Sequence, residues 1–195
     1  MKTVTYILEA SPQRPDLYKL DLGQQRRKLL GRLGMTDWGR SYDGVDLLSR
    51  LEFSLFKDGR IEVSGRDEDL CRKKIDEIRE TVVELFGAFP YTESAVKSVV
   101  IEDEITADIA HVVPDQVLEV VKQKIPDYAI RDVSFDFRKN WKTPESKELV
   151  ASIRFQRVAY KGGKDVPLKL TIVAPGLPES EAILAGLRRE LSQSK

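Results

Sequence analysis

Apolar and polar residues alternate along several short stretches of the chain, and this two-residue period is typical of strands that bury one face. Leu51, Phe53 and Leu55 alternate with polar residues in this way. The same alternation predicts further strands at residues 3–9, 61–63, 96–112, 133–137, 151–155 and 166–172. Asp58-Gly59 separates two of these stretches and predicts a two-residue hairpin turn with φ > 0 at both positions.

A three- to four-residue period of apolar side chains predicts helices elsewhere. Four such helices are expected, at residues 22–33, 67–86, 114–125 and 179–191. Asp67, Glu68 and Asp69 open the second of them, where negative charge favours the positive end of the helix dipole. Residues 35–44 contain two glycines and are expected to form a loop.

The order of the predicted elements is similar in two halves of the chain, residues 1–90 and 95–195. Each half ends in a hairpin, a short loop and a long helix, with turns at Gly59 and at Gly162-Gly163. Because each strand has one apolar face, helices should cover one side of an antiparallel sheet. We therefore expect an α+β fold in which two similar β-α-β-β-α-type halves form an antiparallel sheet, with long helices packed on one face.

The charge of the chain is balanced in total but uneven along its length. There are 32 basic and 32 acidic residues, which does not favour a generic nucleic-acid-binding protein. Residues 66–119 hold six basic and fourteen acidic residues, and residues 138–169 hold nine basic and three acidic residues. These regions could steer a charged partner, or they could neutralise each other within one chain or between two copies.

The cellular setting is indicated by the cysteine content and by hydropathy. A single cysteine, Cys71, excludes an intrachain disulfide, so a reducing cytoplasm is expected. No segment approaches the roughly 18 consecutive apolar residues that span a bilayer. We therefore expect no membrane partner, and no signal peptide at the N-terminus because Glu9 interrupts its short apolar run.

Residue types that carry catalysis or bind metal ions are few. His111 has no histidine or cysteine at a local metal-ligand spacing, and Cys71 lies on an apolar helix stripe typical of a buried thiol. The pair Glu102–Glu104 and the pair Asp132–Asp136 would each share a strand face, but no pattern shows that they converge. No cofactor or metal site is therefore expected, and an enzyme or small-ligand binder with a carboxylate-containing pocket is a third hypothesis.

The best candidates for binding residues lie on the polar face of the second half's strands, with Trp141 in the nearby loop. Basic groups near an aromatic ring suit single-stranded nucleic acid, and they equally suit protein interfaces. These candidates are Arg138, Trp141, Arg154, Gln156, Arg157 and Lys169. The basic helix face at residues 24–28 is a weaker second candidate.

Residues 51–83 resemble a segment of the repeat of the TATA-box-binding protein (TBP) family. The shared features are a strand, a Gly59-Arg60 turn, a short strand that ends in Ser64-Gly65, and a helix with an acidic start. The resemblance implies a saddle-shaped antiparallel sheet with helices on its convex side. The family bends DNA with wedged phenylalanines on a basic saddle; Phe56 is an outward aromatic here, but the paired phenylalanines have no clear counterpart.

The polar sheet face of this chain does not have the charge that such a DNA-binding role needs. Its predicted outward residues include several acids that would repel phosphate: Glu52, Glu62, Glu102, Glu104, Asp132 and Asp136. The leading expectation is therefore a non-enzymatic binding module for a protein partner or for its own copy. The alternative is a nucleic-acid-binding protein that uses the exposed polar sheet face.

Overall fold

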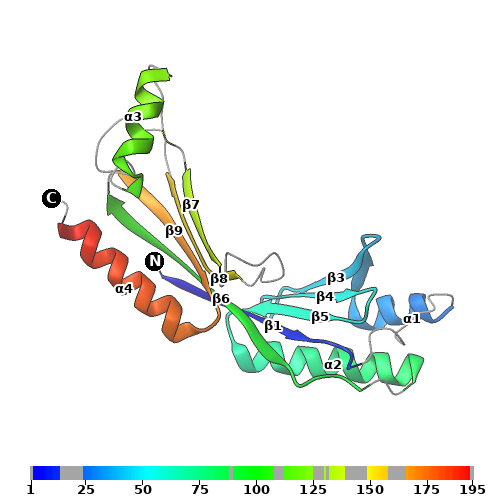
Figure 1. Ribbon diagram of the computed structural model, residues 1–195. Helices are drawn as coiled ribbons and strands as arrows, with labels where there is room; N and C mark the ends of the chain where they lie inside the picture. The colour runs from blue at the N-terminus through cyan, green and yellow to red at the C-terminus, as the bar shows by residue number, and fades with distance from the viewer. Residues whose placement is uncertain are drawn as a thin grey trace. The chain divides into compact units, whose positions relative to one another are not determined.

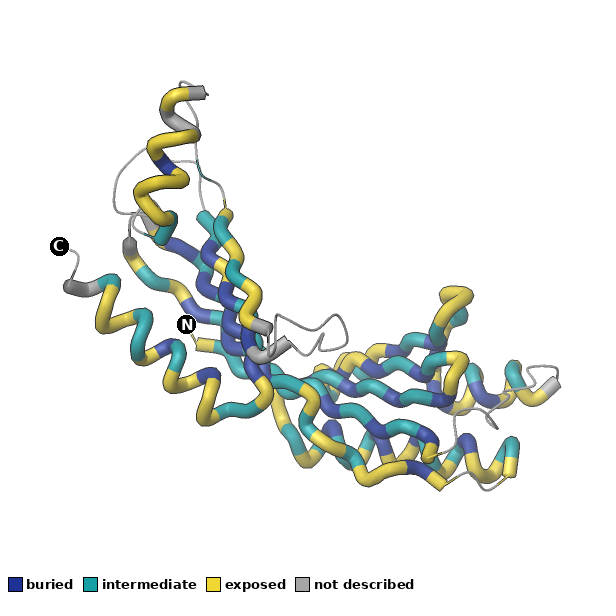
Figure 2. The backbone as a smooth tube through the Cα atoms, viewed as in Figure 1, coloured by how far each residue is buried: buried dark blue, intermediate teal, exposed yellow. Residues whose placement is uncertain are grey.

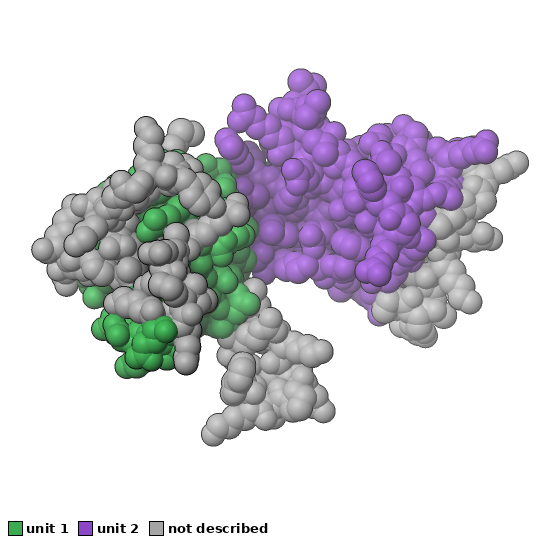
Figure 3. Space-filling view, turned by 90° about the horizontal axis from the view of Figure 1, so that it is seen from above, with its two compact units in different colours: residues 1–4, 99–195 green, residues 5–98 purple. Residues whose placement is uncertain are grey.

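The structure, a computed structural model, describes residues 2–13, 24–87, 90–107, 112–124, 130, 132–138, 149–157 and 166–193 of the 195-residue chain. Within these residues the chain has nine strands and four helices (Figure 1). It divides into two compact units, coloured separately in Figure 3: unit 1 is residues 1–4 and 99–195, and unit 2 is residues 5–98. The strands β1 (Thr3–Ala10) and β6 (Ala95–Ala107) each contribute residues to both units.

Unit 2 is an antiparallel sheet with two helices on one face. Its strand order is β2-β3-β4-β5-β1. Besides β1, its elements are α1 (Gln24–Leu33), β2 (Met35–Asp37), β3 (Ser41–Asp46), β4 (Leu51–Phe56), β5 (Ile61–Gly65) and α2 (Glu68–Phe86). Figure 1 shows α2 lying along the sheet, and Figure 2 marks buried positions on both the helix and the strands. The core combines alternate strand residues such as Leu8, Phe53 and Val63 with Leu29 of α1 and Ile75 of α2.

The local sequence explains why α2 begins and ends where it does. The Asp67 side chain accepts a hydrogen bond from the Leu70 backbone N–H at 3.1 Å, which caps the first turn. Gly87 follows the last helical residue with a φ of 94°, a left-handed conformation that favours glycine. The predicted helix at residues 67–86 is confirmed.

The predicted loop at residues 35–44 is wrong, because these residues form β2 and most of β3. Gly44 lies opposite Phe53 of β4, and a Cβ atom on Gly44 would lie 2.3 Å from a carbon of the Phe53 ring. The glycine therefore gives the phenylalanine ring its space within the sheet. A glycine that indicated a loop in the sequence is a packing residue of a strand.

The hairpin between β4 and β5 has a three-residue loop instead of the predicted two-residue turn. The Gly59 N–H donates to the Phe56 carbonyl at 2.9 Å, and the Phe56 N–H donates to the Arg60 carbonyl at 2.8 Å. Gly59 has a φ of 86°, whereas Asp58 does not have a positive φ. This is the pattern of a turn followed by a single left-handed residue, so only the glycine is required by the backbone.

Unit 1 contains four further antiparallel strands in the order β6-β9-β8-β7. Its further elements are α3 (Asp115–Lys124), β7 (Asp132–Arg138), β8 (Leu149–Arg157), β9 (Val166–Ala174) and α4 (Leu177–Gln193). Leu184 of α4 packs with Ile101, Phe155 and Leu170 of the strands. The predicted turn at Gly162-Gly163 lies outside the described residues.

The fold class expected from the sequence is confirmed. Both units are antiparallel sheets, and the succession strand, helix, strands, long helix occurs in each half of the chain. In the described part of the chain, no helix combines the length and the apolar composition that crossing a membrane requires.

Candidate binding surfaces

In each unit, the strands have a face opposite the helices, here called the open face, which no described helix covers. In unit 2, alternate strand residues lie on the open face because their neighbours are buried against α1 and α2 (Figure 2). The strand registers place these residues in two rows. One row is Glu9, Glu62, Ser54, Asp43 and Thr36, and the other is Ile7, Ser64, Glu52 and Val45.

Two cations on the open face of unit 2 are each shared by the same two acids. The Nη1 atom of Arg60 lies 3.4 Å from Oε2 of Glu9 and 3.6 Å from Oε2 of Glu62. The Nζ atom of Lys97 lies 2.6 Å from Oε2 of Glu62 and 3.3 Å from Oε2 of Glu9. Because both cations are neutralised within the chain, they are poorly available to an external phosphate.

The pKa values of Glu9 and Lys97 reflect the same contacts. Partial burial by itself would raise the pKa of Glu9, but the hydrogen bond and charge of Lys97, with the charge of Arg60, lower it on balance. Burial would also lower the pKa of Lys97, but hydrogen bonds and charges from Glu62 and Glu9 raise it. Both shifts favour the charged forms, so Glu9 and Lys97 remain ionised at neutral pH.

Phe56, the outward aromatic at the end of β4, is stacked against a neighbour. The guanidinium carbon of Arg60 lies 3.8 Å from the centroid of the Phe56 ring, which is the geometry of a cation–π contact. The ring is half-buried. Phe56 therefore supports the hairpin and the orientation of Arg60.

The open face of unit 1 brings together three of the residues singled out in the sequence: Arg154, Gln156 and Lys169. Gln156 lies directly opposite Lys169, and Arg154 is two positions along the same strand from Gln156. The Nζ atom of Lys169 lies 2.5 Å from Oε1 of Glu102. The Arg154 guanidinium donates to Oδ2 of Asp132 at 3.1 Å. The two cations of this surface are thus paired as well.

The other three residues singled out in the sequence do not join this surface in the described structure. Arg157 lies opposite the buried Leu168, so it faces the helix side with Ile153 and Phe155, because the alternation of β8 continues to its last residue. Its Nε atom is buried without a hydrogen-bond partner among the described residues. Arg138 belongs to β7, but its side chain lies outside the described part, as does all of Trp141.

The described side chains give both open faces an acidic balance. Each face has two positive and four negative side chains, a net charge of −2. They are Arg60 and Lys97 with Glu9, Asp43, Glu52 and Glu62 in unit 2, and Arg154 and Lys169 with Glu102, Glu104, Asp132 and Asp136 in unit 1. All four cations form ion pairs. Among the described residues, four of the acids have no ion-pair partner: Asp43, Glu52, Glu104 and Asp136.

The helix side of unit 2 has a small basic groove between α1 and α2. The groove has a volume of about 450 Å³ and is lined by Arg27, Lys28, Gly31, Arg32, Glu84 and Leu85. Arg32 pairs with Glu84 at 2.7 Å, whereas Arg27 and Lys28 have no ion pair with a described residue. Part of the basic helix face expected at residues 24–28 therefore lines this groove, but Arg26 turns away and pairs with Asp37.

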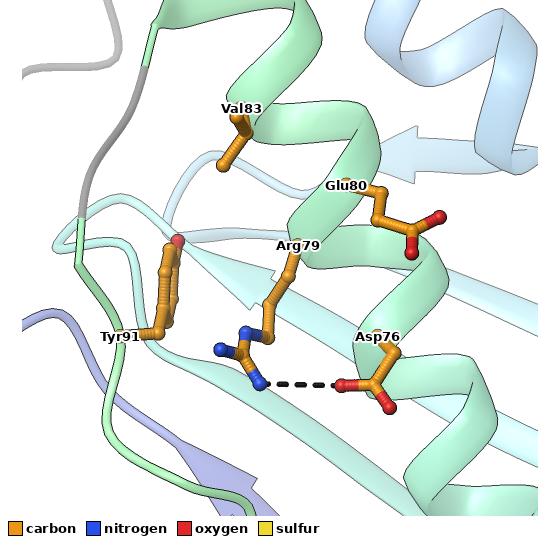
Figure 4. A pocket seen from close by; sticks show the side chains of 5 residues that line it. All are labelled: Asp76, Arg79, Glu80, Val83 and Tyr91. Atoms are coloured by element: carbon orange, nitrogen blue, oxygen red, sulfur yellow. Dashed lines mark hydrogen bonds and ion pairs between the residues drawn. The ribbon is translucent and has the colours of Figure 1, made fainter.

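A second hollow on the helix side, of about 320 Å³, is lined by α2 and by Tyr91 (Figure 4). Arg79 donates to Asp76 at 3.2 Å, and its guanidinium carbon lies 5.7 Å from the centroid of the Tyr91 ring. The Tyr91 hydroxyl donates to the Gly59 carbonyl at 3.0 Å in a buried position. The polar groups here bind one another, which indicates a structural link between the connector before β6 and the β4–β5 hairpin.

Those residues considered for catalysis that the structure describes do not form one site. Cys71 is buried, and burial, with the charges of Asp67 and Glu68, raises its pKa to about 11, so the thiol is protonated at neutral pH. The pair Glu102–Glu104 on β6 and the pair Asp132–Asp136 on β7 are three strands apart, which is roughly 14 Å at the usual strand spacing. His111 lies outside the described residues. Among those that are described, no group of three or more His, Cys, Asp or Glu side chains could hold a metal ion.

Sequence reasoning missed the charge cluster of unit 2, above all Lys97 and Arg60. Lys97 is 35 residues from Glu62, so only the strand order brings them together. The alternation around Glu9 and Glu62 indicated which face these acids occupy, but not which cations would reach them. The signal that would have found the cluster is the strand order β5-β1-β6, which a single sequence does not contain.

Comparisons with known proteins support the fold and leave the function open. No protein-family model and no curated protein matches the chain. Among solved structures, Methanococcus jannaschii TBP is similar over 98% of this chain and 98% of its own, with a TM-score of 0.51 and 9% sequence identity. The chain therefore has a TBP-like fold, as the resemblance of residues 51–83 implied.

Proposed function

We propose that this chain is a non-enzymatic binding module for a protein partner, which docks on the acidic open faces. The observation that carries the proposal is the charge of these faces. Each has a net charge of −2 among its described side chains, its cations are held in ion pairs, and unpaired acids remain exposed on both: Glu52 in unit 2, and Glu104 and Asp136 in unit 1.

The charge of the open faces also indicates the chemistry of the partner. Opposite charges steer association and select partners, so a surface with unpaired carboxylates favours a segment rich in lysine and arginine. Arg60 and Lys97 contribute no free positive charge, because Glu9 and Glu62 hold both. The partner we propose is thus a protein with a basic docking segment.

Nucleic acid binding through the open faces, the alternative function, is disfavoured by the same observation. Affinity for a duplex or a single strand depends on cations that neutralise phosphates. A TBP-like fold does not supply this property, because function depends on the residues at a site and not on the fold that carries them. The two proteins share 9% sequence identity, so their similarity concerns the fold and not the residues on the surface.

Carbodiimide crosslinking tests the proposal, because the reagent joins a carboxylate to a lysine amine only where the two are in contact. Proteins that co-purify with the chain would be crosslinked, digested, and mapped to carboxylates of this chain by mass spectrometry. We expect the crosslinks at Glu52, Glu104 or Asp136. The double variant Glu52→Gln, Glu104→Gln should lose crosslinked product and retain less of the co-purifying protein.

A helix-side carboxylate provides the matched control. Glu80 is an exposed acid of α2, and Glu80→Gln should leave both the crosslinks and the co-purification unchanged. Crosslinks that map to α2, or binding that depends on Glu80 and not on Glu52 and Glu104, would contradict docking on the open faces.

A further inference from the structure

The outer edge of β7 is an unpaired strand edge in the described part of the chain. β7 is the last strand in the order of unit 1, and its seven residues pair with β8 on one side only. In unit 2, β3 has the corresponding place next to β4, but there β2 covers its outer side. An edge strand leaves alternate N–H and C=O groups free to pair with another chain.

The side chains of β7 fit an added strand on their helix side. Val133, Phe135 and Phe137 alternate on that side, and the first two are half-buried against the core of unit 1. Phe137 is 49% exposed, which is unusual for the ring of a core-facing strand position. A strand placed beside β7 would cover this ring.

We propose that β7 pairs in antiparallel fashion with β7 of a second copy of this chain, with Phe135 opposite Phe135. The sequence Asp-Val-Ser-Phe-Asp-Phe-Arg is complementary to itself in this register. It places opposite charges, hydrogen-bonding groups and apolar groups across from one another: Asp132 with Arg138, Ser134 with Asp136, and Val133 with Phe137. The contact is two-fold symmetric about Phe135, so each of these three pairs occurs twice.

Neighbouring registers lack this complementarity. A shift of one residue would turn the apolar residues of the second copy to the opposite face of the joined sheet. A shift of two residues would place Asp132 opposite Asp136 in one direction, or Asp136 opposite Asp136 in the other. Like charges directly opposite each other are destabilising. The charged residues of β7 therefore disfavour the neighbouring registers and favour pairing with β7 of a second copy in this one.

The surroundings of Asp132 and Asp136 on β7 are compatible with this pairing. Asp132 already accepts a hydrogen bond from Arg154 within its own chain, and its strand position lies opposite Arg138 of the second copy in this register. Asp136 has no ion-pair partner among the described residues, which leaves its oxygens available to Ser134 of the second copy. This interface is distinct from the proposed docking of a basic protein, because it needs only the purified chain.

Light scattering on the purified chain, coupled to size-exclusion chromatography, tests the pairing. The expected mass is twice the 22.2 kDa of one chain. The single variants Asp132→Lys and Arg138→Glu should each have the mass of one chain, because each places like charges opposite each other twice. An equimolar mixture of the two variants should recover the doubled mass. In the mixed pair the introduced lysine faces the introduced glutamate, and the unchanged Asp132 and Arg138 face each other.

Two controls separate loss of the interface from loss of the fold. Phe137→Ser, which changes an exposed ring, should also give the mass of one chain, with the circular dichroism spectrum of the original protein. Glu104→Lys reverses a charge on the same open face away from the edge and should keep the doubled mass. A wild-type mass of 22.2 kDa at all concentrations overturns the pairing. The pairing is also overturned if the charge variants keep the doubled mass, or if the mixture of the two variants does not recover the doubled mass. None of these outcomes bears on the crosslinks expected at Glu52 and Glu104 for a basic partner.

Discussion

Gly44 shows how a single residue can be misread from a sequence and explained by its contacts. In the sequence it contributed to a predicted loop, whereas in the structure its missing side chain makes room for the Phe53 ring across the strand pair. Its role is steric, because its φ does not lie in the left-handed region. This role depends on a residue of another strand, so local sequence does not reveal it.

Replacing Gly44 with alanine should destabilise the protein. The added methyl group would lie 2.3 Å from the Phe53 ring, and overpacking of this kind costs about 1–3 kcal/mol of unfolding free energy. Urea denaturation would measure the loss. The matched control is Gly31→Ala in α1, where a Cβ atom meets nothing within 4 Å. That change should stabilise the protein by roughly 0.5–1 kcal/mol, because glycine is a poor helix former. Equal effects of the two changes would contradict this account.

The charge cluster around Lys97 gives a prediction that depends on pH. The lowered pKa of Glu9 means that its contribution is complete above its ordinary value of 4.5 and is lost as pH falls through its folded-state pKa. The raised pKa of Lys97 means that its contribution is complete below 10.5 and is lost as pH rises through its folded-state pKa. Lys97→Met should therefore lower stability at neutral pH, by up to about 1 kcal/mol for such partly exposed pairs.

The difference between Lys97→Met and the original protein should shrink as the pH falls below 4.5 and through the lowered folded-state pKa of Glu9, because the carboxylate is then protonated in both. Urea denaturation at neutral and at acidic pH measures this. Lys73→Met is the control, since Lys73 is exposed on α2 and has no ion pair with a described residue. A pH-independent loss in Lys97→Met would show that the lysine stabilises by packing and not by charge.

At the scale of elements, the helices and most strands could be predicted because their signals are local. The helix at residues 67–86 has an N-cap, an acidic first turn, an apolar stripe and a terminal glycine within its own sequence. β4 and β5 follow a simple alternation. β2 was missed because it is three residues long, and β3 because of Gly44.

The cap of α2 can be tested by one substitution. Asp67→Ala removes the side-chain oxygen that accepts from the Leu70 N–H, and losing such a cap costs about 0.5–2 kcal/mol. Thermal denaturation followed by circular dichroism would measure the change. Asp69→Ala, in the first turn of the same helix, removes an equal charge without removing the cap, so its cost should be smaller. Similar losses would mean that the helix dipole, and not the cap, dominates.

At the scale of the whole molecule, the fold could be predicted from the sequence. The candidate binding surfaces could be predicted only in part. The resemblance of residues 51–83 indicated a TBP-like fold, which the comparison of structures confirms. The acids on the outward strand positions could also be predicted, because alternation fixes the face of each residue. The pairing of Lys97, Arg60, Arg154 and Lys169 with those acids could not, because it depends on strand order.

We propose that the open faces bind protein and do not hold nucleic acid. Titration of the chain with duplex and single-stranded DNA, at low and at physiological salt, tests it most directly. We expect that the chain binds neither duplex nor single-stranded DNA even at low salt, where phosphate contacts are strongest. Binding that weakens steeply with salt, and that is reduced by Arg154→Gln or Lys169→Gln but not by Lys73→Gln, would contradict it.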